Sequence, residues 1–176
     1  MKKFILILVS IFMIMIVYNK NEENETVKIP DSAIRFRVLA NSNSPRDQKI
    51  KENIRDILQK ELYLLLKNSK NTNEARTIIN NNIFSFAELV KNELADANYS
   101  YEIDYGMHYF PEKTYKGITY DEGEYESLLV TLGEGKGNNW WCVLFPPLCV
   151  LEAEQTTNTD ETEYKFFIKE IIEKYF

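Results

Sequence analysis

The sequence predicts an α+β fold: a small, mainly antiparallel sheet of about three strands, two antiparallel helices on one face of it, and a further helix at the C-terminus. Three observations support this prediction. Apolar and polar residues alternate over residues 34–40 and 99–109, as they do in strands. Apolar residues recur at helical spacing in two long stretches between those strands. The 176 residues, 44% of them apolar, can bury the core of a single domain.

The start of the chain is interpreted as an export segment followed by a tether. Lys2 and Lys3 precede an apolar run, and residues 1–18 together have the charge and length of a signal peptide. The run is shorter than the roughly 20 residues that span a bilayer comfortably, yet no A-x-A-like cleavage site follows it. A removed signal peptide and an uncleaved membrane anchor therefore both stay open. Residues 19–30 are polar and acidic, which is typical of a tether, and the remainder is expected to be exported.

The predicted domain covers residues 31–150 and begins with the strand at 34–40. The apolar residues of this strand share one face, and Arg35 and Arg37 share the other. The simpler interpretation of the two arginines is a solvated face of the sheet. The alternative is a basic pair offered to an acidic partner.

Two helices are expected after this strand. The first runs over residues 45–67, because Ser44 can cap it and a proline suits the first helical position. The second carries its apolar stripe over residues 72–97 and is capped by Asn71 or Thr72. Because the link between them is short, the helices should be antiparallel neighbours.

The next strands are predicted at residues 99–109 and 124–132, paired as an antiparallel hairpin with a long loop between them. The sequence does not specify which strand pairs with the one at 34–40. Residues 151–176 are expected to form an acidic linker and a terminal amphipathic helix. Docking on the sheet is the simpler role for this helix, and binding a partner or a membrane surface is the alternative.

One stretch, Gly133 to Cys149, contains both tryptophans and both cysteines of the chain. Three of its glycines stand at alternate positions and permit unusual backbone angles. A Pro-Pro pair near its end excludes a helix or a central strand there. We therefore expect a rigid, irregular, aromatic-rich loop. A turn at the prolines could bring Cys142 within disulfide distance of Cys149, and at this stage a disulfide and two packed thiols are equally open.

Composition and motifs exclude several functions. The net charge of −6 argues against a nucleic-acid partner, which requires a concentrated basic face. The GEGKG segment is not a phosphate loop, because Lys136 is followed neither by Ser or Thr nor by a helix. The two cysteines and the single histidine, His108, do not fill the four positions of a zinc site. No metal or cofactor is expected.

A cysteine hydrolase acting on peptide or cell-wall amide bonds is the enzymatic alternative. Cys142 would be the nucleophile, His108 the base, and Asp104 or Glu102 the group that orients the base. Two features weigh against it: His108 lies on the solvent-like face of its strand, and the large apolar neighbours of Cys142 disfavour a reactive thiolate. No known nucleophile signature surrounds this cysteine either. We therefore expect no enzyme activity.

Three segments resemble the stage II sporulation protein R family: residues 34–45, residues 123–128 and above all residues 133–149. In the last of them a tryptophan pair, a double proline and two cysteines follow in a specific order. The resemblance covers roughly residues 29–149 and leaves out the C-terminal helix. It supplies no catalytic residues to carry over.

The resemblance implies a signalling protein of endospore formers. Such a protein is made in the forespore and secreted into the space between the forespore and mother-cell membranes. There it activates a membrane-bound aspartic protease, which removes the pro-sequence of the mother-cell sigma factor. An uncleaved N-terminal segment would in addition hold the chain at the membrane. A purely structural scaffold of the same compartment is a third interpretation.

For an activator, we hypothesise that the 133–149 stretch and its expected neighbours form the surface that faces the protease. Exposed aromatic side chains would act as the anchors that dominate many interfaces. The alternative is that both tryptophans belong to the core. The proposed surface consists of Arg37, Asn41, Ser42, Gly135, Gly137, Asn139, Trp140, Trp141 and Phe145.

Overall fold

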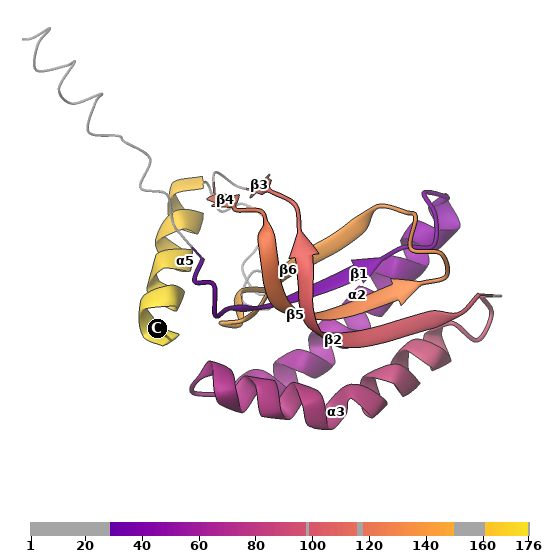
Figure 1. Cartoon of the computed structure of the whole chain (residues 1–176), viewed down its shortest axis with the longest axis horizontal. Helices are drawn as coiled ribbons and strands as arrows, with labels where there is room; N and C mark the ends of the chain where they lie inside the picture. The colour runs from indigo at the N-terminus through magenta and orange to yellow at the C-terminus, as the bar shows by residue number, and fades with distance from the viewer. Residues whose placement is uncertain (1–28, 98, 116–117, 150–160, 176) are drawn as a thin grey trace, which may run out of the picture.

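The computed structural model describes residues 29–97, 99–115, 118–149 and 161–175 (Figure 1). The predicted export segment and nearly all of the predicted tether lie outside these ranges. No helix within them is both long and apolar enough to span a membrane. In chain order the elements are β1 (Ile34–Leu39), α2 (Pro45–Leu66), α3 (Thr72–Glu93), β2 (Tyr101–Phe110), β3 (Lys113–Tyr115), β4 (Ile118–Tyr120), β5 (Gly123–Leu132), β6 (Asn139–Phe145) and α5 (Glu161–Tyr175).

The described residues form a four-stranded sheet with the strand order β2-β5-β1-β6. The predicted hairpin is confirmed, because β2 pairs antiparallel with β5 from Tyr101 opposite Leu132 to Phe110 opposite Gly123. β1 lies in the middle, parallel to β5 and antiparallel to β6. The α+β class and the mainly antiparallel sheet are confirmed, with one strand more than expected. The long loop of the hairpin carries a separate two-stranded ribbon, β3–β4.

Both long helices begin where their caps predict. The Ser44 side chain accepts a hydrogen bond from the backbone of α2, and Asn71 does the same for α3. The two helices lie side by side on one face of the sheet (Figure 1). α3 ends at Glu93, earlier than expected from its apolar stripe. The apolar stripe in the sequence extends to Ala97. This residue lies in the bend after the helix and still packs against the first core.

Apolar side chains pack on both faces of the sheet, so the domain has two apolar cores. Side chains of α2 and α3 pack on the first face, against residues such as Phe36 and Leu128. α5 packs on the second face through Tyr164, Ile168 and Ile171. Docking on the sheet, the simpler of the two roles for this helix, is therefore the one observed.

The solvated position expected for Arg35 is wrong. Its side chain is 1% exposed, and its guanidinium carbon lies 3.4 Å from the ring centroid of Tyr125. Phe110 and Trp141 each lie at 5.0 Å from the same carbon. The alternation in β1 identified the correct face for Arg35 but did not show that α5 and the aromatic side chains around it cover that end of the face.

The irregular loop expected over 133–149 is wrong for residues 139–145. The backbone is irregular up to Asn138, and residues 139–145 then form β6 along β1. Aromatic and branched residues of this segment favour a strand, while the glycines before it and the prolines after it dominate the local sequence pattern. The strand does stop before Pro146, as a proline requires.

Candidate partner-binding site

Two segments far apart in the sequence meet at one end of the sheet; we call residues 40–44 and 133–138 the paired loops. The Asn41 side-chain oxygen accepts a hydrogen bond from the Glu134 backbone at 2.9 Å. The backbone N–H of Gly137 donates to the Ala40 carbonyl at 2.8 Å. These bonds hold the two loops as one surface, so the structure places Asn41 and Ser42 beside the glycine segment, as hypothesised.

Asp47, in the first turn of α2, holds the first of the paired loops in place. Its carboxylate accepts a hydrogen bond from the Ser42 hydroxyl at 2.6 Å and another from the Asn41 amide at 2.8 Å. These two bonds lower the pKa of Asp47, and Ser42 makes the larger contribution. The side chains of Asn41 and Ser42 are thus engaged in holding the loop itself.

Replacing Asp47 by asparagine is expected to destabilise the chain at neutral pH, and to destabilise it less near pH 3. A carboxyl with a lowered folded-state pKa stabilises the fold above its unfolded pKa, about 3.9. That contribution is lost as the pH falls through the folded-state pKa. Urea unfolding of wild type and Asp47→Asn at both pH values checks this. A stability difference that is the same at pH 3 as at pH 7 would contradict it.

The aromatic residues of β6 lie at different depths. Trp141 is 8% exposed and packs edge to face against two rings. The centroid of its ring lies 5.5 Å from that of Phe110 and 5.2 Å from that of Tyr120. Phe145 is fully buried in the first core. Trp140 is half-buried, with its ring 5.6 Å from Phe36. In this conformation only Trp140 of the three has appreciable surface to offer a partner.

Arg37 connects β1 to both edges of the sheet. One of its guanidinium nitrogens donates to the Tyr109 carbonyl of β2 at 3.1 Å. With the Asn139 amide turned so that its oxygen faces Arg37, that oxygen accepts a second bond at 2.7 Å. Both side chains are half-buried, so they combine a structural role with a small exposed surface next to the paired loops.

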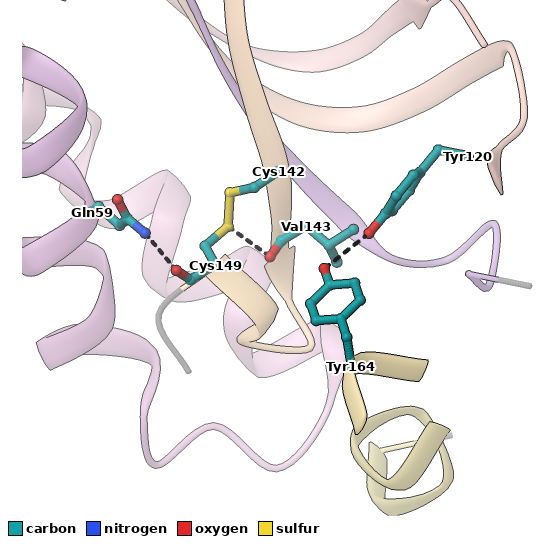
Figure 2. The surroundings of a disulfide bond; sticks show 6 residues. All are labelled: Gln59, Tyr120, Cys142, Val143, Cys149 and Tyr164. Atoms are coloured by element: carbon teal, nitrogen blue, oxygen red, sulfur yellow. Dashed lines mark hydrogen bonds between the residues drawn. A yellow bond between two sulfur atoms is a disulfide. The ribbon is translucent and has the colours of Figure 1, made fainter. Parts of the chain in front are cut away.

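The two cysteines form a disulfide, with their Cα atoms 5.7 Å apart (Figure 2). The bond joins β6 to Cys149, which follows Pro146, Pro147 and Leu148. From α2, the Gln59 amide donates to the Cys149 carbonyl at 2.5 Å. Of the two alternatives left open by the sequence, the disulfide is the one observed.

Comparison with known proteins places the chain in a family. The family model for stage II sporulation protein R matches residues 30–155. The chain belongs to the stage II sporulation protein R family. It is 40% identical to stage II sporulation protein R of Bacillus subtilis (strain 168) over an alignment 185 positions long, which covers 99% of this chain and 83% of the relative. No solved structure matches the chain.

In this member of the sporulation protein R family, the cysteine–histidine pair expected of a hydrolase does not form. Cys142 is bonded to Cys149 and packs toward the first core. His108 lies on the opposite edge strand, β2, with its ring on the second face, where it contacts Ser127 of β5. The disulfide removes the thiol that would have been the nucleophile, and the strand order separates it from the base.

His108 instead joins Asp104 and Ser127 in an arrangement that sequence reasoning missed. Its two ring nitrogens lie 2.7 Å from the Ser127 hydroxyl and 2.9 Å from the Asp104 carboxylate. A hydrolase needs an accessible serine and a shielded carboxylate. Here Ser127 is fully buried and the Asp104 side chain is 61% exposed. The three residues are therefore interpreted as a structural link between β2 and β5.

The described ranges contain no group of three His, Cys, Asp or Glu side chains able to hold a metal ion.

Sequence separation concealed the link between His108 and Ser127, which lie 19 positions apart. The even spacing between Asp104 and His108 was the one available signal, because it places both side chains on the same face of a strand.

Proposed function

We propose that the chain is a secreted signalling protein of sporulation, which activates a membrane-bound aspartic protease and so triggers processing of the mother-cell sigma factor precursor. The observation that carries the proposal is membership of the stage II sporulation protein R family, matched over residues 30–155. The site of action would be the space between the forespore and mother-cell membranes.

The disulfide supports export. Bonded cysteines persist in oxidising compartments outside the cytosol, and Cys142 and Cys149 form such a bond. The apolar start of the sequence supplies a matching route across the membrane. Two independent features of the chain thus agree with a protein that acts outside the cell that makes it.

The paired loops support a role as a ligand. An activator shifts its target between two states by binding one of them more tightly, and a rigid surface binds with less loss of conformational entropy. The loops are held together by hydrogen bonds to Asn41 and Gly137 and braced by Asp47. We propose that they contact the protease together with the half-buried Arg37, Asn139 and Trp140, while Trp141 and Phe145 belong to the two cores.

The proposal predicts what happens when the chain is deleted from its sporulating host. The sigma factor precursor should accumulate, and expression of the full chain in the forespore should restore its processing, as followed by immunoblot. A version without residues 1–18 should fail to restore processing, because it is not exported. Normal processing in the deleted strain would contradict the proposal, and rescue by the truncated version would contradict the exported site of action.

A further inference from the structure

The two long helices leave a groove between them on the side that faces away from the sheet. Two hollows open to solvent lie along the seam of α2 and α3, with volumes of about 420 and 300 Å³. Leu65 and Ile78 line the first, and Glu61 and Leu89 line the second. Because the sheet fills the other side of the seam, both hollows belong to one outer groove, which we call the helix groove.

The most exposed large apolar side chain of the described ranges lies in the helix groove. Phe84 lines the second hollow and is 77% exposed. A single apolar side chain on a surface is ordinary, but Phe84 lies next to an apolar floor. Three half-buried residues that also pack against the first core form this floor: Leu65, Ile78 and Leu89. No helix or strand of the described ranges covers them from outside (Figure 1).

The charged side chains that line the helix groove all have the same sign. They are the carboxylates of Glu61, Glu74 and Glu88. Glu61 forms no ion pair with any residue of the part of the chain that the structure describes. Glu88 lies 3.4 Å from Lys91 in an exposed pair, and such pairs contribute little. A partner that supplies cations can therefore form charge-assisted contacts here without breaking a strong ion pair.

The length and shape of the helix groove select the class of partner. Its floor runs from Ile78 to Leu89 of α3, about 16 Å at 1.5 Å per residue, which is about three turns of helix. The ridges of a further helix pack into a groove of this kind, between side chains spaced three or four residues apart. Both hollows are open to solvent, whereas sites for small molecules enclose most of the ligand surface.

We propose that an amphipathic, cationic helix of a protein partner packs in the helix groove, with its apolar face on Phe84 and the floor and its lysines or arginines near Glu61 and Glu88. The assignment rests on the proposed function in taking the activated protease as the source of that helix. It adds a contact on the helical layer, apart from the paired loops at the end of the sheet.

Fluorescence anisotropy of a labelled peptide tests the helix groove directly. The full-length chain is titrated into a helical peptide of about four turns, with leucines at helical spacing on one face and lysines on the other, and into a twin with glutamates in place of the lysines. The lysine peptide should bind at least about tenfold more tightly, because its cations face carboxylates. Equal affinities, or no binding of the lysine peptide, would overturn the proposal.

Two exposed phenylalanines supply the matched control. Phe84→Ser should weaken binding of the lysine peptide about tenfold, because the peptide would no longer bury an aromatic ring. Phe166→Ser, on α5 at a residue that is 70% exposed, should leave the affinity unchanged. Since both rings are exposed, and serine and phenylalanine have similar helix propensities, both variants should melt like wild type. Unchanged binding by Phe84→Ser would overturn the proposal.

Removal of charge tests the carboxylates of the helix groove. Glu61→Gln/Glu88→Gln should bring the affinities of the two peptides closer together, whereas Glu112→Gln/Glu124→Gln, at exposed positions outside the groove, should not. Both double variants change the net charge equally, so a general attraction between the acidic chain and a cationic peptide would respond to both alike. An equal response would overturn the assignment of the partner's cations to Glu61 and Glu88.

A lipid surface and a second copy of the chain are the other occupants to test. Flotation with vesicles of phosphatidylglycerol and phosphatidylcholine tests the first, and analytical ultracentrifugation tests the second. Phe84→Ser should behave like wild type in both measurements. Loss of flotation in Phe84→Ser, or loss of a dimer that wild type forms, would overturn the proposal in favour of that occupant.

The phenylalanine variants also separate the helix groove from the function on which its assignment rests. In cells where the wild-type chain restores processing of the sigma factor precursor, Phe84→Ser should not, and Phe166→Ser should. Full rescue by Phe84→Ser would overturn the helix groove as a partner contact and leave the proposed function standing. Failure of the wild-type chain to restore processing would overturn the proposed function alone, since the peptide titration decides the groove independently.

Discussion

Replacing Gly137 by alanine should lower the free energy of unfolding by about 3 kcal/mol, as expected for an overpacked site that cannot relax. A Cβ atom at this position would lie 2.6 Å from the Ser42 carbonyl carbon and 2.8 Å from the Ala40 Cβ. Atoms that are not bonded do not approach so closely, and the neighbours are backbone or backbone-attached. The paired loops would therefore have to separate, with loss of the bond from Gly137 to the Ala40 carbonyl. Urea unfolding followed by circular dichroism measures the change.

Gly106 provides the control for this prediction. A Cβ atom there would meet only the Asp104 carboxylate, at 3.6 Å, an ordinary van der Waals distance. Gly106→Ala should therefore leave the unfolding free energy within about 1 kcal/mol of wild type. If Gly137→Ala were as stable as Gly106→Ala, the close packing of the paired loops would be wrong.

Loss of the disulfide should cost about 2–3 kcal/mol of unfolding free energy. In the chain-entropy account, this is the effect of opening a short loop, and the two cysteines are 7 positions apart in the sequence. The anchor from Gln59 to the Cys149 carbonyl should loosen as well. The double replacement Cys142→Ser/Cys149→Ser, and the wild-type chain after reduction, should both unfold at lower urea concentration than the oxidised chain.

The reduced wild-type chain is the closest control for the disulfide, because it changes no side chain other than the bond itself. If it unfolded at the same urea concentration as the oxidised chain, the bond would contribute nothing to stability. The double-serine variant also tests the enzymatic alternative, because it has no thiol. Where it is folded and exported, it should still trigger processing of the sigma factor precursor.

Local patterns were sufficient to predict most of the fold. The helices α2 and α3 begin at caps visible in the sequence. The β2–β5 hairpin follows from the alternation over residues 99–109 and from the apolar positions Leu128, Val130 and Leu132 of the second strand. β6 was missed because its seven residues lie between glycines and prolines, which are typical of loops. The environment of Arg35 was missed for a different reason: the side chains that cover it come from β2, β5 and β6, and α5 closes that face. No local pattern reports such contacts.

The candidate site was predictable only in part. The sequence hypothesis placed Asn41 beside the glycine segment, and the bond from the Glu134 backbone to Asn41 confirms that placement. It also offered Trp141 and Phe145 to a partner, whereas both are buried. Whether a tryptophan on a strand faces solvent or a core depends on what covers each face of the sheet, which the strand itself does not encode.

We propose above all that this chain activates a membrane-bound aspartic protease. The most direct test is reconstitution of that protease and the sigma factor precursor in liposomes, with cleavage followed with and without the purified chain. We predict rapid cleavage only when the chain is added on the side of the membrane opposite the precursor, and none when the chain meets the precursor without the protease. Cleavage at the same rate in the absence of the chain, or cleavage by the chain alone, would contradict the account.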